Sequence, residues 1–185
     1  MARISYLQKE QADPFIKEAF QKLEDQKLLI LNLFKVVGHC PRIARNFMRL
    51  GDAILRKDDL SPKFRELAIL RVGYLNRAVY EYTKHVPMGR NEGLSQVQID
   101  SIPDWTNSNK FDENERAVLS YTDEVTLLVK ATDATFNKIK GFLDEAGIVK
   151  LTATIGYYGM VCRILESLEV DLDAGEKSLL PGFNR

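Results

Sequence analysis

The stretch Arg65-Glu66-Leu67-Ala68-Ile69-Leu70-Arg71-Val72 lies within a segment that is apolar on almost every face. Ser61 and Pro62 precede it, and an N-cap residue followed by proline at the first helical position indicates that a helix begins there. We expect this helix to continue to about Leu75. It should be buried, because a helix that is hydrophobic all round has no face suited to water.

A second helix is expected after a short break at Asn76-Arg77, since asparagine tolerates the left-handed conformation that ends helices. This helix carries Tyr80-Glu81-Tyr82-Thr83-Lys84-His85 and then meets Pro87, which lacks a backbone donor and should kink or restart it. Glu81 and His85 are four residues apart, so their side chains share one helix face and can form a hydrogen bond.

The two helices are expected to bring three titratable side chains together. A turn near Asn76 would fold them against each other, so that Glu66 approaches His85 from the side opposite Glu81. Two carboxylates around one imidazole form a proton-handling arrangement, with His85 as the acid or base. Two structural alternatives remain open: a solvated Glu–His pair, which contributes roughly 0.2 to 0.5 kcal/mol on a helix, and a buried structural network.

Helical periodicity runs along the rest of the chain, and no strand alternation is visible. We expect an all-α, single-domain protein of about seven to eight helices over residues 1–185. It would have an N-terminal helical arm over about 1–60, a core over about 61–168, and a tail over 169–185 that lies on the domain or on a neighbouring subunit.

Several boundaries in this pattern are specific enough to test. Ser95 with Gln98 and Asp112 with Glu115 have the spacing of capping boxes, and each marks a helix start. Further helices are expected over 28–37, 133–147 and 149–168, and a loop is expected over 103–109.

The composition argues against two classes of partner. Hydrophobic residues make up 45% of the 185 residues, enough for a continuous core, and 26 basic and 26 acidic side chains give a formal charge of zero. We therefore expect no nucleic-acid partner and no attraction to an anionic membrane. The longest apolar run, 28–34, is too short to span a bilayer, and the N-terminus lacks the apolar stretch of a signal peptide, so we expect a soluble, cytoplasmic protein.

Neither cysteine chemistry nor a metal site is expected. Cys40 and Cys162 belong to no C-x-x-C pair, and both are expected to be buried thiols rather than catalysts. Glu81 and His85 alone are too few ligands for a metal ion, so we expect no metal and no cofactor.

These motifs resemble a known family. The segments Arg65-Glu66-Leu67-Ala68-Ile69-Leu70, Tyr80-Glu81-Tyr82, His85 and Gly93-Leu94-Ser95 are similar to the central motif of the carboxymuconolactone decarboxylase and alkylhydroperoxidase D (AhpD) superfamily. The segment Gly156-Tyr157-Tyr158-Gly159-Met160-Val161-Cys162-Arg163 resembles the C-terminal helix of its longer members. The resemblance extends over about residues 32–173 and implies an AhpD-like helical fold and a homo-oligomer.

In the hydroperoxidase branch of this superfamily, a glutamate, a C-x-x-C pair and a histidine serve a peroxide-reducing dithiol. Glu66 and His85 match the glutamate and histidine positions, but Ala78 and Glu81 occupy the cysteine positions. Neither residue can attack a peroxide oxygen and then form a disulfide, so the resemblance does not imply a cysteine-based peroxidase here.

In the decarboxylase branch, a glutamate stands four residues before the histidine, as Glu81 does before His85. That branch removes carbon dioxide from an unsaturated lactone acid and protonates the resulting dienolate. The resemblance therefore implies His85 as proton donor, Glu81 as its orienting partner, and Arg163 as a cation for the substrate carboxylate.

The substrate-binding assignments have structural alternatives. Arg163 could instead form a buried salt bridge with Glu66 or Glu166. Tyr82 and Tyr157 are further candidates for substrate binding, although aromatic residues at helical spacing also belong to cores.

The sequence therefore predicts a cofactor-independent acid–base enzyme, of lyase or isomerase type, that acts on a small cyclic or unsaturated organic acid. Two alternatives remain open. One is an AhpD-like antioxidant protein that has lost the catalytic cysteines, and the other is a non-catalytic oligomeric binding protein.

Overall fold

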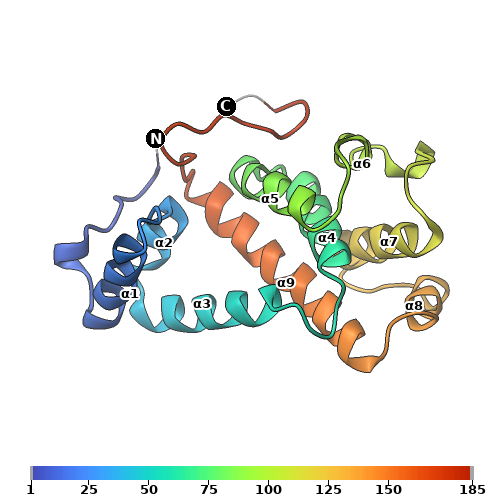
Figure 1. Ribbon diagram of the computed structural model, residues 1–185, viewed down its shortest axis with the longest axis horizontal. Helices are drawn as coiled ribbons and strands as arrows, with labels where there is room; N and C mark the ends of the chain where they lie inside the picture. The colour runs from blue at the N-terminus through green and yellow to red at the C-terminus, as the bar shows by residue number, and fades with distance from the viewer. Residues whose placement is uncertain (1, 184–185) are drawn as a thin grey trace.

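The computed structural model describes residues 2–183, which form nine α-helices, two short 3₁₀ turns and no strand (Figure 1). The all-α, single-domain expectation is confirmed. The 3₁₀ turns are Lys9–Gln11 and Trp105–Asn107. The α-helices are α1 Pro14–Asp25, α2 Asn32–Val37, α3 Pro41–Leu55, α4 Pro62–Leu75, α5 Val79–Asn91, α6 Gln96–Ser101, α7 Glu113–Leu128, α8 Asp133–Lys140 and α9 Glu145–Ser167.

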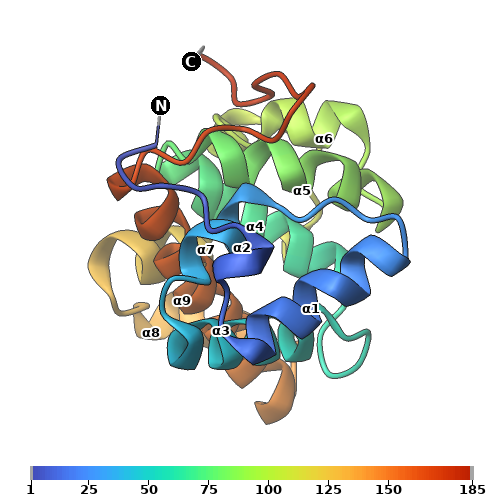
Figure 2. The same ribbon diagram turned by 90° about the vertical axis from the view of Figure 1, so that its left-hand side faces the viewer.

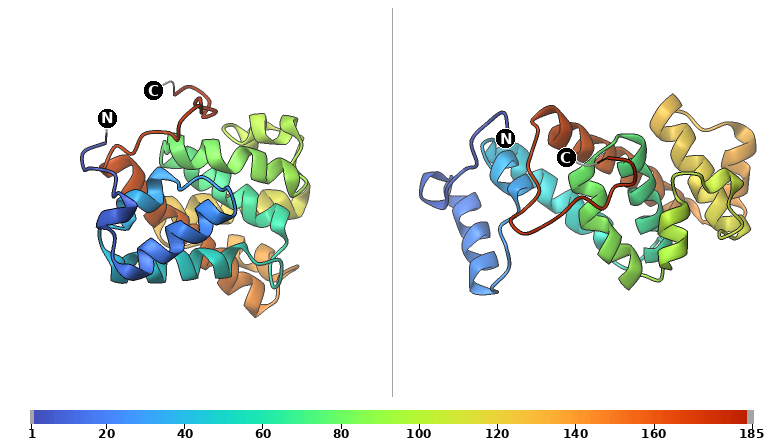
Figure 3. Two further views of the ribbon diagram at one scale, coloured as in Figure 1. Left: turned by 60° about the vertical axis from the view of Figure 1, so that its left-hand side comes forward. Right: turned by 90° about the horizontal axis from the view of Figure 1, so that it is seen from above.

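Helix α4 is the centre of the packing because it has no hydrophilic face. Every residue from Arg65 to Gly73 is buried, and α5, α7 and α9 surround this helix (Figures 1 and 3). A buried charge needs a partner, and Arg71 finds one in Asp123 of α7, with 2.6 Å between Nε and Oδ1. The position of α4 fixes where the side chains of its neighbours can meet.

Helix α9 is the longest element and runs obliquely past α3 on one side and α4, α5 and α7 on the other (Figure 1). The Asp144 carboxylate begins it by accepting a hydrogen bond from the Gly147 amide at 2.8 Å. The length and composition of α9 would also suit a membrane span, but half of its most apolar window is buried in the fold. Core helices of globular domains have the same character.

The N-terminal segment from residue 2 runs beside the tail that follows α9 (Figure 2), where the Ala2 amide donates to Asp171 at 3.1 Å and the Arg3 amide to the Leu168 carbonyl at 2.8 Å. In the tail, the Asp173 carboxylate accepts from the Asn32 amide at 2.8 Å and from the Tyr80 hydroxyl at 2.6 Å, and it pairs with Lys84 Nζ at 2.6 Å. The tail therefore lies on its own domain, and Asp173 ties the start of α2 to α5.

Three expected helix limits and one expected loop are wrong. Helix α9 begins at Glu145 rather than 149. Helix α2 begins at Asn32 rather than 28, at the amide that the distant Asp173 caps. Helix α8 ends at Lys140 rather than 147, because the Asp144 cap starts α9 before Gly147. The segment 103–109 contains a 3₁₀ turn rather than only loop. Both capping boxes, at Ser95 and Asp112, are confirmed.

The break between α4 and α5 also differs in detail from the expectation. Arg77, with φ of 55°, takes the left-handed conformation, while Asn76 keeps a φ of −85° and its side chain donates to the Val72 carbonyl at 2.8 Å. Pro87 lies inside a helix that continues to Asn91, so it does not restart α5. The turn nevertheless folds α5 back along α4, as the site requires.

Candidate functional site

His85 is held between two carboxylates that come from adjacent helices. Its Nδ1 lies 2.7 Å from Oε2 of Glu66 on α4, and its Nε2 lies 3.0 Å from Oε1 of Glu81, one turn earlier on α5. All three side chains are buried. The structure therefore brings together the three residues that the sequence singles out, with the two carboxylates on opposite sides of the ring.

The second oxygen of Glu66 is engaged by its neighbour Arg65. Both Nε and Nη2 of Arg65 lie 3.0 Å from Glu66 Oε1, and Nη1 donates to the Leu55 carbonyl at 3.1 Å. Charge-assisted bonds of this kind are the strong ones in a protein. Glu66 is thus fixed on both oxygens and serves as a rigid support for the His85 ring.

The two carboxylates make His85 a cation at neutral pH. Burial alone would lower the pKa of His85, but the hydrogen bonds and negative charges of Glu66 and Glu81 outweigh it and raise the pKa from 6.5 to about 9. The ring then donates from Nδ1 to Glu66 and from Nε2 to Glu81. A proton that shifts from Nε2 to the Glu81 carboxylate would leave the pair neutral, so Glu81 and His85 can carry one proton between them.

A mainly apolar cavity of about 390 Å³ adjoins this pair. Its walls come from four helices: Leu33 and Phe34 of α2, Phe47 and Met48 of α3, Met88 of α5, and side chains of α9. Its volume suits a small organic molecule. Glu81 and His85 line the cavity, whereas Glu66 lies behind them.

Aromatic rings from α9 connect the far wall of the cavity to His85. The ring of Tyr158 meets the His85 ring edge-on, with centroids 4.9 Å apart, and Tyr157 packs at 5.2 Å on the other side of Tyr158. The Tyr157 hydroxyl donates to the Phe47 carbonyl at 3.1 Å. Gly51 permits this approach, because a Cβ there would meet the hydroxyl at 2.7 Å.

Of the three residues expected to bind substrate, the structure places one in the cavity. Tyr157 lines it, but Tyr82 faces α6, where its hydroxyl donates to the Ile99 carbonyl at 3.3 Å. Arg163 is exposed, and its Nη1 donates to the Gly159 carbonyl at 2.7 Å. Tyr82 and Arg163 therefore stand outside this cavity, which corrects the expectation that they bind substrate there.

The sequence analysis did not assign Lys84 or Tyr158 to the site. Lys84 lines the cavity beside His85, and Tyr158 lines it from α9. Glu81, Lys84, His85 and Met88 follow the spacing i, i+3, i+4 and i+7, so one helix face carries them all, and this signal could have identified Lys84. Nothing local to α5 indicates Tyr158.

The cysteines occupy unrelated positions. Cys40 is exposed at the N-cap of α3, contrary to the expectation that both thiols are buried, while burial of Cys162 on α9 raises its thiol pKa well above 9. Ala78 is the N-cap residue of α5.

Within residues 2–183, no group of three or more histidine, cysteine or acidic side chains is arranged to hold a metal ion.

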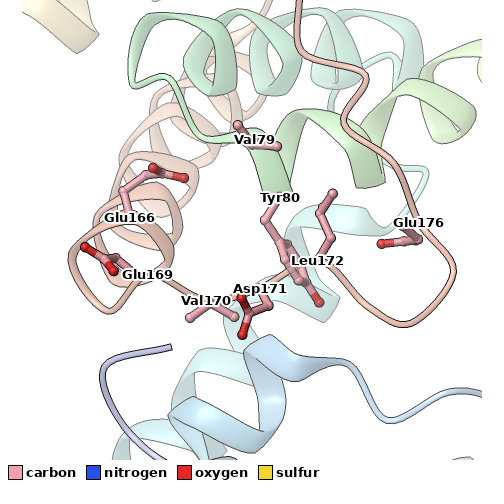
Figure 4. Close-up of a pocket in the computed structure, with 8 residues that line it drawn as sticks. All are labelled: Val79, Tyr80, Glu166, Glu169, Val170, Asp171, Leu172 and Glu176. Carbon is pink, nitrogen blue, oxygen red and sulfur yellow. The ribbon is translucent and has the colours of Figure 1, made fainter. Parts of the chain in front are cut away.

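A second hollow, of about 630 Å³, lies where the tail leaves α9 (Figure 4). Its walls include Glu166, Glu169, Asp171 and Glu176, and Tyr80 separates it from the cavity beside His85. Arg3 pairs with Glu169 at 2.8 Å, and the Tyr6 hydroxyl donates to Asp171 at 2.9 Å, so terminal residues already compensate part of its acidity.

Known proteins share part of the sequence and the fold of this chain. Residues 41–124, which include Glu66, Glu81 and His85, match the model of the carboxymuconolactone decarboxylase family. A solved protein of unknown function from Agrobacterium tumefaciens, suggested to be the antioxidant defence protein AhpD, is 27% identical. The match covers 74% of this chain and 94% of that one, with a TM-score of 0.68. The region that carries the site, residues 41–124, therefore matches the carboxymuconolactone decarboxylase family, and the chain as a whole is similar to AhpD-type structures.

Two solved structures of lower sequence identity share the fold over nearly the whole chain. An AhpD-core, peroxidase-related protein from Ralstonia eutropha is 16% identical, with a TM-score of 0.81 over 94% of this chain and 93% of that one. A variant of the debrominase Bmp8 in complex with 2,3,4-tribromopyrrole is 16% identical, with a TM-score of 0.77 over 92% and 91%. No curated protein matches the chain significantly.

Proposed function

We propose that this protein is a cofactor-independent acid–base enzyme that moves a proton at carbon in a small cyclic or unsaturated organic acid, or in a lactone of such an acid. The observation that supports it is the Glu81–His85 pair, which lines an apolar cavity and is fixed from behind by Glu66. A charged pair kept in such surroundings by a third group has the geometry of proton-transfer sites.

In an isomerisation, Glu81 would remove a proton from the carbon next to a carbonyl group. The C–H electron pair would move toward the carbonyl oxygen and give a dienolate, and the same proton would return from Glu81 to the far carbon of the unsaturated system. His85 would remain an imidazolium throughout. Its Nε2–H would hold the Glu81 carboxyl group in place while it carries the proton from one carbon to the other.

In a decarboxylation, the bond to the carboxylate carbon would break, carbon dioxide would leave, and its bonding electrons would form the dienolate. The Glu81–His85 pair would then donate one proton to that carbon of the dienolate, and a proton from water would reprotonate the pair. The two reactions share the dienolate, so the same pair serves either.

Cysteine-based peroxide reduction is not proposed, although two related structures have AhpD-type or peroxidase-related names. The chemistry needs two thiols that can form a disulfide after one attacks peroxide. Here Ala78 and Glu81 stand at those positions, one cysteine is exposed on α3 and the other is buried on α9.

The test uses α-angelica lactone, whose double bond moves into conjugation with the carbonyl when one proton is transferred. Isomerisation is followed by ultraviolet absorbance, and exchange at carbon by NMR in D₂O. We expect catalysis above solvent background, and a loss of about 10²- to 10⁴-fold in Glu81→Gln and His85→Gln. His39→Gln is the matched control, because His39 is exposed and contacts the Ser5 carbonyl.

Carbon dioxide release from a lactone that carries a carboxylate is measured in parallel. Background rates in both assays, with the folded wild-type protein, would overturn the proposed function and favour the non-catalytic alternative.

A further inference from the structure

Tyr158 is unusual among the buried tyrosines because its hydroxyl has no hydrogen-bond partner in residues 2–183. The hydroxyls of the other buried tyrosines are all used: Tyr80 donates to Asp173, Tyr82 to Ile99, and Tyr157 to Phe47, and Tyr121 bonds Thr152. Buried polar groups normally form hydrogen bonds. A buried hydroxyl without a partner in the protein therefore indicates a partner from outside it, such as a ligand.

The Tyr158 hydroxyl is also not fully enclosed by the core. Among the described side chains, only Thr126 Oγ1 is both unpartnered and closed to solvent. The Tyr158 side chain is 4% exposed and lines the cavity beside His85, so the cavity is the space to which its hydroxyl has access. A ligand atom there would be near both the Tyr158 hydroxyl and the Glu81–His85 pair.

Tyr158 would act as a neutral donor rather than as a phenolate. Burial raises the pKa of Tyr158 well above 10, and the negative charges of Glu81 and Glu66 raise it further. A phenol that keeps its proton can donate one hydrogen bond to an acceptor such as a carbonyl oxygen.

The charges around the cavity disfavour an anionic ligand. Lys84 lines the cavity, but its Nζ already lies 2.6 Å from carboxylate oxygens of both Asp173 and Glu176. The imidazolium of His85 is balanced by Glu66 and Glu81. A carboxylate brought into this cavity would lose its hydration without meeting an uncompensated cation, and that loss is costly.

We propose that Tyr158 donates a hydrogen bond to the carbonyl oxygen of an uncharged, enolisable cyclic substrate and so holds its α-carbon against Glu81. This inference rests on the proposed function and narrows its substrate to the neutral carbonyl compound. As the α-C–H bond breaks and its proton passes to Glu81, the electron pair moves onto the oxygen that faces Tyr158. The hydrogen bond strengthens as that charge develops and weakens when the proton returns to carbon.

Binding is tested first, with two probes that share a five-membered carbon ring: cyclopentanone, which is neutral, and cyclopentanecarboxylate, which is an anion. We expect cyclopentanone to bind the wild-type protein at least about tenfold more tightly than the anion. Its carbonyl stretching band should shift to lower frequency when bound, and Tyr158→Phe should abolish that shift. Tyr121→Phe is the control, because it removes a hydroxyl that bonds Thr152 away from the cavity.

Turnover is tested second, with α-angelica lactone. We expect Tyr158→Phe to lower kcat by about 10²-fold, the loss typical of one oxyanion donor, while the Tyr121→Phe rate stays at the wild-type value. The inference would be overturned, and the proposed function left standing, by tighter binding of the anion than of cyclopentanone. It would be overturned in the same way if bound cyclopentanone kept its shifted carbonyl band in Tyr158→Phe. If cyclopentanone binds with the shifted carbonyl band but no probe is turned over, the proposed function is overturned instead.

Discussion

The Nδ1 atom of His85 lies 2.7 Å from Oε2 of Glu66, and this contact joins α5 to α4 at the centre of the fold. The ring has Glu81 on its other nitrogen, so a single side chain satisfies two buried carboxylates. Since an ionised carboxylate is stable in a core only when it is paired and hydrogen-bonded, the protonation of His85 and the packing of the two helices depend on each other.

The first prediction concerns the titration of His85. With only two histidines in the chain, NMR of the imidazole groups should resolve both, and His85 should titrate near its pKa of about 9. If the NMR titration shows that the His85 imidazole loses its proton below pH 7, the imidazolium assignment is wrong.

The same shift predicts how stability depends on pH. The pKa of His85 is raised in the folded state, so its stabilising contribution is complete below about 6.5 and is lost as the pH rises through about 9. Between these values, the free energy of unfolding of the wild-type protein should fall relative to His85→Gln by up to roughly 1.4 kcal/mol per pH unit. Denaturant titrations at several pH values measure this difference. Parallel profiles for the two proteins would be the contrary result.

The second prediction is that Glu66→Gln destabilises the fold and lowers the pKa of His85. The change removes one of the two charges that stabilise the imidazolium, and it leaves the buried Arg65 with only the more distant carboxylate of Glu92, at 4.0 Å. Breaking a buried pair in this way costs about 3 to 5 kcal/mol. Glu18→Gln is a suitable control, because Glu18 pairs with Lys22 on an exposed helix surface, where little change in unfolding free energy is expected.

The sequence was sufficient for the parts of the site that depend on local order. The all-round apolar character of α4, the turn near residue 76 and the four-residue spacing of Glu81 and His85 place three side chains together without knowledge of the other helices. Helical phase also explains one error. Tyr82 lies about 100° around the helix from Glu81, so it faces α6 and not the cavity.

The remainder of the site depends on contacts between distant segments. Tyr158 reaches His85 only because α9 packs across α5, and Lys84 is neutralised by carboxylates of the tail. The start of α2 likewise depends on Asp173. No periodicity within a helix encodes which residue of another helix will face it, so these features required the structure.

The third prediction is that the protein has no cysteine-based peroxidase activity. Peroxide turnover with a dithiol reductant should be at background, because a buried thiol of raised pKa such as Cys162 is a poor nucleophile and Cys40 lies on another helix. The double variant Cys40→Ser with Cys162→Ser should match the wild-type protein. Turnover in the wild-type protein that disappears in the double variant would show that the thiols do react.

The fourth prediction concerns the wall of the cavity that α2 forms. Asp173→Asn should weaken the cap on the Asn32 amide and the pair with Lys84, and so loosen α2 where Leu33 and Phe34 line the cavity. Hydrogen exchange of the α2 amides should therefore become faster. Asp13→Asn is a control of the same kind, since Asp13 caps α1 at the Phe15 amide and should affect only that helix. Unchanged exchange in α2 would mean that Asp173 is not what holds it.

Several apolar side chains of α3 and α9 are exposed. Ile43 and Leu50 of α3 are 55% and 45% exposed, Val149 and Met160 of α9 are 67% and 39% exposed, and Leu50 and Val149 border one shared hollow. An exposed apolar surface such as the one around the hollow between Leu50 and Val149 is typical of an interaction site. A second copy of the chain is the partner that the family resemblance implies.

The fifth prediction is therefore a homo-oligomer with an interface of at least about 1,000 Å² that includes this surface. Light scattering at micromolar concentration should give a multiple of the 21.1 kDa chain mass. Leu50→Glu and Val149→Glu should each shift the protein toward monomer, because a charge would be buried without a partner. Leu127→Glu changes a leucine at the end of α7 that is 62% exposed, and it should leave the mass unchanged. A wild-type mass near that of one chain would refute the oligomer, and dissociation by Leu127→Glu alone would place the interface elsewhere.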